Sequence, residues 1–179
     1  MIKKDINQND ILNSELLNII DYNYIFDEKP IKRMKVKPTL ENFKSRLDSL
    51  KNKIEAIENC DLKKNASKIV FADGNIQSSI MIVGEGPGQK EDELGKPFVG
   101  DAGNLLNKML KAINVNRDKI YITNVVNYRP PNNRKPEPNE INRYSEFLKE
   151  HISIINPKIL ILMGSTAMEA ILGSNKRIS

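Results

Sequence analysis

The sequence has very little cysteine and no long hydrophobic run. Its 179 residues include one cysteine, Cys60, which excludes an internal disulfide and cannot by itself hold a zinc ion or an iron–sulfur cluster. No apolar run approaches the roughly 18 residues that a membrane span needs. The first ten residues, MIKKDINQND, also lack the apolar stretch of a signal peptide. We therefore expect a cytoplasmic protein that has no membrane partner.

The composition is that of an ordinary globular protein. Hydrophobic residues make up 39% of the chain and charged residues 28%, and the length is enough for one domain with a buried core, or for one domain and an arm. Lysine and arginine outnumber aspartate and glutamate by 28 to 23, a net charge of +5. This modest excess suits a polyanionic partner such as a nucleic acid without requiring one.

The first part of the chain reads as an arm. Apolar residues gather within residues 10–26, and the basic, proline-containing stretch DEKPIKRMKVKPT follows. We predict an N-terminal helical arm and basic linker over residues 1–38, and a main domain over residues 39–179. Thr39 is placed to cap a helix whose apolar residues follow a 3-4-3-4-3 spacing and form one stripe that packs on the body of the domain. The stripe consists of Leu40, Phe43, Leu47, Leu50, Ile54 and Ile57.

After Cys60, short apolar runs alternate with helical patterns. The segments SSIMIVGE, KIYITNVVNY and PKILILMG read as strands, and AGNLLNKMLKAI, NEINRYSEFLKEHISII and STAMEAILG read as helices. Nearly continuous apolar strands separated by helices predict an α/β fold, a three-layer αβα domain with a short parallel sheet. Ligands of such sheets bind beyond the carboxyl ends of the strands. The loop that follows the first strand, TNVVNYRPP and GSTA all lie at such ends.

That first loop, GEGPGQKEDELGKPFVG over residues 84–100, is rich in glycine. It could be a phosphate cradle, a pocket for a flat ligand or an ordinary turn. Both the P-loop and the dinucleotide-binding pattern need a glycine five positions after Gly84, where this chain has Gln89. Gly86 and Gly88 would still let the backbone approach a ligand closely, because glycine has no Cβ. The pocket and the turn remain open at this point.

Three separated segments together resemble one known family. They are GEGPGQKEDELGKPFVGDAGNLLNKML, YITNVVNYRPPNNRKPEP and INPKILILMGSTAMEAILG, and each crosses a strand, a loop and a helix. They resemble the uracil-DNA glycosylase superfamily, and most of all its type 4 branch, whose members hold an iron–sulfur cluster. The resemblance covers roughly residues 58–173. It implies a protein that hydrolyses the N-glycosidic bond of uracil in DNA and thereby initiates base-excision repair.

The resemblance also implies roles for individual residues. Glu85 and Gly86 would belong to the loop that activates water and contacts the base, Phe98 would stack on the flipped ring, and Asn124 would read its edge. A flat apolar ring is worth about 1–3 kcal/mol per stacked base, and an amide offers donors and an acceptor that match uracil but not cytosine. The alternatives are that Phe98 simply plugs the end of the core and that Asn124 is a turn residue.

The charged residues near these segments can also be interpreted in two ways. Arg129, Arg134 and Lys135, around the Pro-Pro bend, are candidates for contacts with DNA phosphates, or they belong to a charged surface loop. The acidic side chains of residues 91–93 are expected to form a solvated patch, although such a loop could orient the water.

Two departures from the family stand out. Type 4 members bind a [4Fe–4S] cluster with four cysteines, of which only Cys60 is kept. The other three positions fall on Ile57, Tyr128 and Tyr144. We therefore expect no cluster and no metal, with aliphatic and aromatic side chains in its place, and no other cofactor.

The second departure is at the carboxyl end. Family members continue into a fourth strand and a loop with a His-Pro motif, whose histidine stabilises the departing uracil. This chain ends at Ser179, and His151, its only histidine, does not match that position. We expect the last strand to be missing, as in an interrupted or truncated product, and His151 to be an ordinary residue on a helix surface. Losing one such donor can slow a reaction by about 10²–10³-fold.

We therefore expect a uracil-DNA glycosylase-like protein whose partner is uracil-containing DNA. The lost cluster cysteines and the missing histidine loop could impair its activity. Two alternatives remain open. One is a non-catalytic remnant that still binds DNA, and the other is a module that binds a protein partner along its uncovered sheet edge.

Overall fold

The computed structural model describes residues 39–173, all of which fall within one compact unit, Pro38–Ser179. The arm predicted for residues 1–38 lies outside the described residues, so it stays a prediction. None of the helices over residues 39–173 has both the length and the apolar character needed to cross a membrane.

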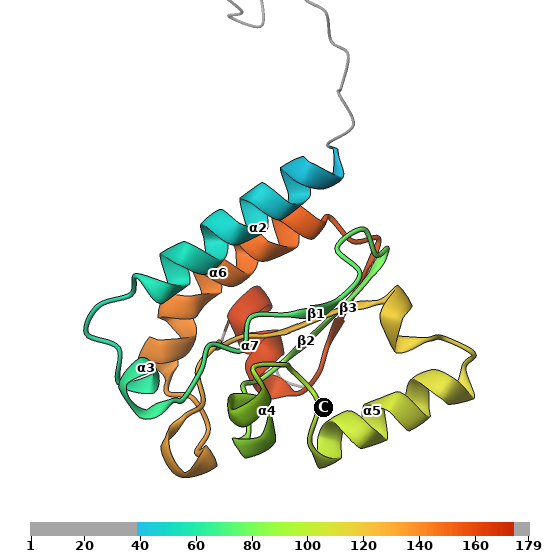
Figure 1. Cartoon of the computed structure of the whole chain (residues 1–179). Coiled ribbons are helices and arrows are strands. Elements are labelled where there is room, and N and C mark those ends of the chain that lie inside the picture. The colour runs from blue at the N-terminus through green and yellow to red at the C-terminus, as the bar shows by residue number, and fades with distance from the viewer. Residues whose placement is uncertain (1–38, 174–179) are drawn as a thin grey trace, which may run out of the picture. The chain divides into compact units, whose positions relative to one another are not determined.

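A four-stranded sheet forms the middle layer (Figure 1). In the order β1-β3-β2-β4, the strands are Asp73–Gly74, Tyr121–Asn124, Ile80–Gly84 and Ile159–Leu162. The central strand β2 runs parallel to β3 and β4, as the sequence predicted. The short β1 pairs antiparallel with β3 and was not predicted, because two residues carry no apolar pattern. The sheet is therefore mixed rather than wholly parallel.

Helices cover both faces of the sheet, which confirms the three-layer αβα fold (Figure 1). Three of them share one face: α2 (Leu40–Glu55), α6 (Pro138–Ile155) and α7 (Ser165–Leu172). The opposite face carries α5 (Asp101–Ala112). The connections hold shorter helices: α3 (Asp61–Asn65), α4 (Gln89–Leu94), η1 (Arg117–Lys119) and η2 (Pro131–Asn133).

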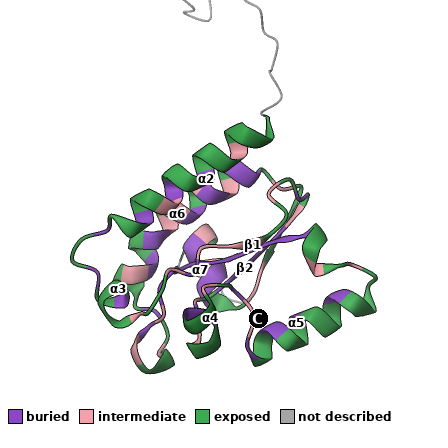
Figure 2. Ribbon diagram, viewed as in Figure 1, coloured by how far each residue is buried: buried purple, intermediate pink, exposed green. Residues whose placement is uncertain are grey.

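Successive side chains of β2 belong to two different core clusters, one on each face of the sheet. Met81 and Val83 belong to the larger cluster under α2, α6 and α7, whereas Ile82 belongs to the smaller cluster under α5. Figure 2 shows the buried positions on the inward sides of the helices. Successive side chains of a strand point to opposite faces, so one apolar strand supplies both clusters.

The long helix α2 forms as its sequence predicts. The side-chain oxygen of Thr39 accepts a hydrogen bond from the backbone N–H of Asn42 at 3.3 Å, which is the predicted N-cap. Leu47, Leu50 and Ile54 of its apolar stripe are buried. This stripe packs along α6, so α2 is part of the domain (Figure 1).

His151 is not a surface residue, and the prediction that it would be one was wrong. Its side chain is 2% exposed, its Nε2 atom lies 2.7 Å from the hydroxyl oxygen of Tyr121, and its ring stacks on Phe71 at 4.7 Å. His151 lies on the buried stripe of α6, three residues after Leu148 and four before Ile155. Burial lowers the pKa of His151 to about 3, so this histidine is neutral at physiological pH.

Candidate active site

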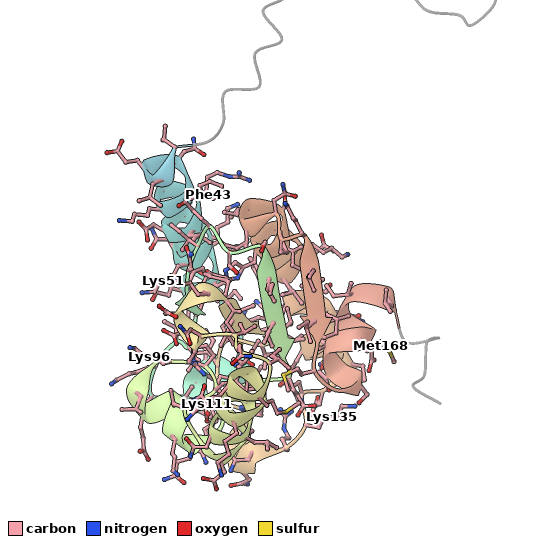
Figure 3. The ribbon with its side chains drawn as sticks, turned by 90° about the vertical axis from the view of Figure 1, so that its right-hand side faces the viewer. Phe43, Lys51, Lys96, Lys111, Lys135 and Met168 are labelled. Carbon is pink, nitrogen blue, oxygen red and sulfur yellow. The ribbon has the colours of Figure 1, made fainter. Side chains whose placement is uncertain are left out.

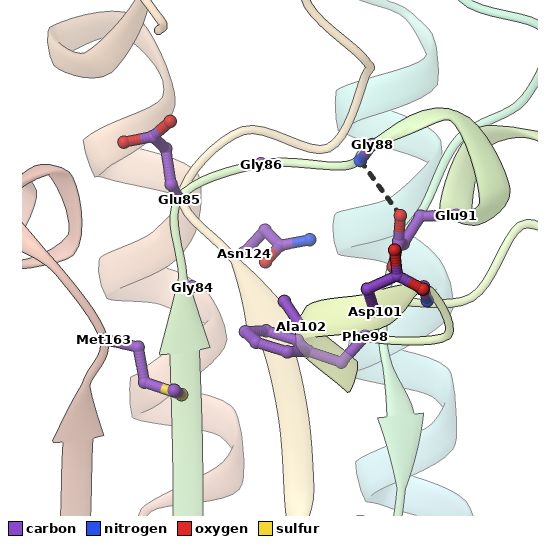
Figure 4. A pocket seen from close by; sticks show the side chains of 11 residues that line it. Gly84, Glu85, Gly86, Gly88, Glu91, Phe98, Asp101, Ala102, Asn124 and Met163 are labelled. Atoms are coloured by element: carbon purple, nitrogen blue, oxygen red, sulfur yellow. Dashed lines mark hydrogen bonds between the residues drawn. The ribbon is translucent and has the colours of Figure 1, made fainter. Parts of the chain in front are cut away.

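A pocket of about 390 Å³ opens beyond the carboxyl ends of the parallel strands, within the usual size range of small-molecule sites. Its walls come from the ends of β2, β3 and β4, from the loop before α4 and from the start of α5 (Figure 4). Its lining includes Glu85, Gly86, Glu91, Phe98 and Asn124. The structure thus brings together all four residues predicted to bind uracil.

Gly84, the last residue of β2, makes room for two of them. A Cβ atom at Gly84 would lie 2.5 Å from Cζ of Phe98 and 2.6 Å from Oδ1 of Asn124, closer than real Cβ contacts. The ring of Phe98 therefore lies directly on the end of β2 (Figure 4). It also packs on the core under α5, so Phe98 closes the end of the core and lines the pocket at the same time.

Asn124 ends β3 and pairs in register with Gly84. Its side chain is only 3% exposed. Within residues 39–173, its Nδ2 atom is the one buried side-chain nitrogen or oxygen that has no hydrogen-bond partner. Figure 4 shows this amide between the ring of Phe98 and the backbone of Gly86. Because a buried donor without a partner costs about 1–3 kcal/mol, the amide is placed to gain from a ligand acceptor.

Glu85 stands at the rim of the pocket. Its carboxylate accepts a hydrogen bond of 2.5 Å from the hydroxyl of Thr166, and Figure 4 shows it pointing away from Asn124 and Phe98. Thr166 is fully buried in the first turn of α7. Sequence reasoning placed GSTA at a strand end but did not single out Thr166, although a hydroxyl beside a helix start was the available signal.

Gly86 lines the pocket and also packs against the loop after β3. A Cβ atom at Gly86 would lie 2.8 Å from a methyl carbon of Val126, so the absent side chain makes room for the β3 loop. The backbone N–H of Val126 donates to the carbonyl of Glu85 at 3.2 Å. These contacts hold the loops after β2 and β3 against each other.

The prediction that residues 91–93 form a solvated acidic patch is wrong for two of the three side chains. Glu91 is 9% exposed, and its carboxylate accepts hydrogen bonds from the backbone N–H groups of Gly88, Val99 and Gly100 at 3.2, 2.9 and 2.7 Å. Asp92 is 3% exposed and accepts from the N–H of Ser67 at 2.9 Å. Only Glu93 is exposed. Glu91 thus joins the two ends of the pocket loop, and Asp92 ties α4 to the segment before β1, both by satisfying backbone donors.

The three basic residues predicted to contact DNA differ in their surroundings. Arg134 forms two hydrogen bonds with the carboxylate of Glu140, at 2.8 and 2.7 Å, and the guanidinium holds the pKa of Glu140 below its usual value. Arg129 donates to the side chain of Asn133 at 2.7 Å. Lys135 is exposed, with its ammonium 3.5 Å from the Ser165 hydroxyl at the start of α7, and Figure 3 shows it on the side of the domain that carries α7.

The four positions that carry cluster ligands in type 4 members come together in this chain. Ile57, Cys60, Tyr128 and Tyr144 are all buried in the larger core cluster. The sulfur of Cys60 lies 3.5 Å from the hydroxyl oxygen of Tyr144, and burial raises the pKa of that phenol well above its usual value. With one thiol and two neutral phenols, these side chains do not fit a [4Fe–4S] cluster. No group of three or more metal-ligating side chains occurs within residues 39–173.

Comparison with known proteins identifies the family of this chain. A sequence model of the uracil DNA glycosylase superfamily matches residues 71–178. The type-4 uracil-DNA glycosylase of Thermotoga maritima is 39% identical over 130 residues, which cover 73% of this chain and 68% of that protein. The type-4 enzyme of Archaeoglobus fulgidus is 41% identical over 70% of this chain and 63% of its own length. For that of Sulfurisphaera tokodaii the identity is 44%, over 66% of this chain and 54% of its own length.

The alignments therefore span between just over half and about two thirds of the length of these relatives. The superfamily match, over residues 71–178, includes both strand-end loops that form the pocket. The chain belongs to the uracil DNA glycosylase superfamily and is similar to its type-4 members.

Proposed function

We propose that this chain is a uracil-DNA glycosylase, which hydrolyses the bond between uracil and deoxyribose in DNA and so starts base-excision repair. Its glycosylase domain would be residues 39–179, preceded by the arm at residues 1–38. One observation carries the proposal: the buried, unpartnered amide of Asn124 lines a pocket that the ring of Phe98 also lines. A planar base can stack on this ring and accept a hydrogen bond from this amide at its polar edge.

In the proposed mechanism, the uracil nucleotide leaves the DNA stack and its base enters the pocket. The base stacks on Phe98, and the free Nδ2 donor of Asn124 binds a carbonyl oxygen on its edge. Cytosine has an amino group where uracil has the O4 carbonyl, so a donor at that place rejects cytosine. Gly84 supports this geometry because any side chain there would displace both Phe98 and Asn124.

Bond cleavage requires a water molecule at the anomeric carbon, where positive charge develops as the base departs. We assign the activation of this water to Glu85, whose carboxylate lies at the pocket rim. Gly86 would contact the base through its backbone, which lies beside the Asn124 amide (Figure 4). Thr166 would keep the Glu85 carboxylate in place through its hydrogen bond.

DNA would approach along the face that carries the Pro-Pro bend. Among the three basic candidates, Lys135 is the one whose surroundings leave it most available for a phosphate, because Arg134 is engaged by Glu140 and Arg129 by Asn133. We therefore propose Lys135 as the main phosphate contact, with Arg129 and Arg134 contributing after rearrangement. Charged contacts of this kind position the protein on DNA without reading its sequence.

We further propose that the protein needs no iron–sulfur cluster. The packing of Cys60, Tyr128 and Tyr144 supports this, because these side chains fill one continuous apolar core. Their packing would take over the role of joining α3, α6 and the loop after β3.

The test is uracil release from a labelled oligonucleotide with a single uracil, under single-turnover conditions with protein in excess. Release by the wild type that Asn124→Ala abolishes, and that Phe98→Leu slows, would support the proposal. A matched control is Asn142→Ala, which removes an exposed amide from the surface of α6. No release above background by a folded wild-type protein would refute the enzymatic proposal for this chain.

One observation favours a second candidate, the binding of a protein partner. Among the described strands β4 forms an edge of the sheet, and its Ile159 and Ile161 are 53% and 42% exposed. Exposed apolar edge strands are templates for pairing with another strand. Sedimentation of the chain at increasing concentration tests this, and a concentration-independent monomer would count against self-association through β4. DNA binding without base release would instead indicate a non-catalytic DNA-binding protein.

A further inference from the structure

Phe98 has an unusual backbone conformation. Its φ angle is +51°, in the left-handed region that bulky residues other than glycine rarely adopt. Five other residues within 39–173 share a positive φ without being glycine, and all five are asparagines, which tolerate this region far better. Something in the surrounding structure must therefore hold the backbone of Phe98 in place.

Arg117, in η1, contacts this backbone directly. Its Nη1 atom donates to the carbonyl oxygen of Phe98 at 3.0 Å and its Nη2 atom to the carbonyl oxygen of Pro97 at 2.7 Å. The same guanidinium binds the carboxylate of Asp73 in β1 through Nε and Nη2, at 3.1 and 3.0 Å. The side chain of Arg117 is 23% exposed. A rigid fork of donors thus joins the loop to the edge of the sheet.

The Phe98 carbonyl is also confined by α5. A Cβ atom at Gly103 would lie 1.9 Å from that oxygen, so the first turn of α5 packs against the same group that Arg117 binds. Arg117 reaches this helix too, since Nη1 lies 3.2 Å from the side-chain oxygen of Asn107. Loop, helix and sheet edge therefore meet at one guanidinium.

We propose that Arg117 is a positioning residue for base recognition, which fixes the ring of Phe98 over the end of β2 by holding the carbonyls of Pro97 and Phe98. The inference deepens the proposed function and rests on it. Arg117 does not line the pocket, so it acts only through Phe98. Because the ring already touches Gly84 and lies near Asn124, a small shift of this backbone changes the gap that a flat base has to fill.

A lysine cannot replace Arg117 in this role. An ammonium carries the same charge, but it is a point donor and cannot bridge two carbonyls and a carboxylate in one plane. The role is therefore distinguished from simple charge neutralisation of Asp73, which a lysine could provide.

The chain offers a matched control in Arg143. This arginine of α6 also donates to two consecutive backbone carbonyls, those of Glu58 and Asn59, and Asn59 likewise has a positive φ, +50°. Its loop does not line the pocket. Arg143→Ala thus removes an equivalent clamp from a different loop.

The experiment compares Arg117→Ala, Arg117→Lys and Arg143→Ala with the wild type in two measurements. The first is hydrogen exchange of residues 96–100, whose Val99 and Gly100 amides are bound by Glu91 in the intact loop. The second is single-turnover uracil release, together with the affinity for uracil-free DNA. We expect both Arg117 variants to exchange faster in this segment and to release uracil about 10²-fold more slowly. Their affinity for uracil-free DNA should not change, and Arg143→Ala should resemble the wild type in both measurements.

Unchanged exchange of residues 96–100 in Arg117→Ala would overturn the inference, as would uracil release at the wild-type rate. Equal losses in Arg143→Ala would also overturn it, because they would show a general effect on stability. Wild-type behaviour of Arg117→Lys would show that charge alone suffices. If the wild type itself releases no uracil, the proposed function fails, and the exchange measurement alone then decides whether Arg117 holds the Phe98 backbone.

Discussion

The hydroxyl of Thr166 donates a hydrogen bond to the carboxylate of Glu85, joining the first turn of α7 to the residue after β2. Thr166 is fully buried whereas Glu85 is exposed, so a donor held in the core orients a carboxylate at the surface. Hydrogen bonds to charged groups contribute about 1.5–3 kcal/mol. Residues 81 positions apart in the chain are thereby tied together at the pocket rim.

We expect Thr166→Val to slow uracil release by about 10- to 100-fold, because the Glu85 carboxylate loses the donor that orients it. Valine has nearly the shape of threonine, so the packing of α7 is retained. Thr166→Ser restores a hydroxyl and should recover most of the rate. Single-turnover release at saturating DNA, measured alongside thermal unfolding, checks both expectations, and equal rates for the valine and serine variants would contradict them.

Most of the fold could be predicted from the spacing of apolar residues along the chain. The 3-4 spacing of apolar residues in α2 and the apolar runs of β2, β3 and β4 follow from burial alone, and each element formed where it was expected. β1 could not be predicted because its pairing depends on an aspartate and a glycine. The prediction for His151 was wrong because its position on the stripe of Tyr144, Leu148 and Ile155, rather than its polarity, decides its burial.

The resemblance pointed to Phe98 and Asn124 as two residues around one base, and the structure brings their side chains together at Gly84. Asn124 ends β3, whereas Phe98 lies in the loop before α5, so its position could not be derived from a strand pattern. Glu91 and Asp92 were misassigned because their carboxylates bind backbone N–H groups of the loop and of residue 67, partners that no spacing reveals. Arg117 left no signal for the same reason, since its role depends on carbonyls twenty residues away in the chain.

The buried His151 should make stability depend on pH. Its pKa is about 3 in the folded protein against a usual value of 6.5, so below about pH 6.5 the unfolded chain binds a proton that the folded chain does not. The free energy of unfolding should therefore fall as pH falls, by up to about 1.4 kcal/mol per pH unit. Above that value this group contributes no pH dependence.

Urea unfolding at several values between about pH 5 and pH 7 measures this slope away from most carboxylate titrations. His151→Gln keeps a side chain able to bond with the Tyr121 hydroxyl but does not titrate, so its slope should be flatter. Identical slopes for the variant and the wild type would show that other groups cause the pH dependence.

The core around Cys60 should be stable without iron. We expect a chelator to leave the melting temperature unchanged and the purified protein to show no visible absorbance of an iron–sulfur cluster. Tyr144 is 1% exposed, so Tyr144→Ala should destabilise the protein by about 3–5 kcal/mol, as truncation of a buried aromatic ring does. Tyr144→Phe, which removes only the hydroxyl near Cys60, should cost much less. Stoichiometric iron in the purified protein would contradict this picture.

Lys135 and Arg134 should contribute unequally to DNA binding. Lys135 has only a weak contact with Ser165, so Lys135→Ala should weaken binding regardless of sequence and reduce the slope of log affinity against log salt by about one. Arg134 is already paired with Glu140, so Arg134→Ala should change the slope less.

Lys149→Ala, which removes an equal charge paired with Glu146 on the surface of α6, is the control and should leave the slope unchanged. Fluorescence anisotropy of a labelled oligonucleotide over a salt series measures all three slopes. Equal reductions for Lys135 and Lys149 would show that the effect is one of net charge rather than of a phosphate contact made by Lys135.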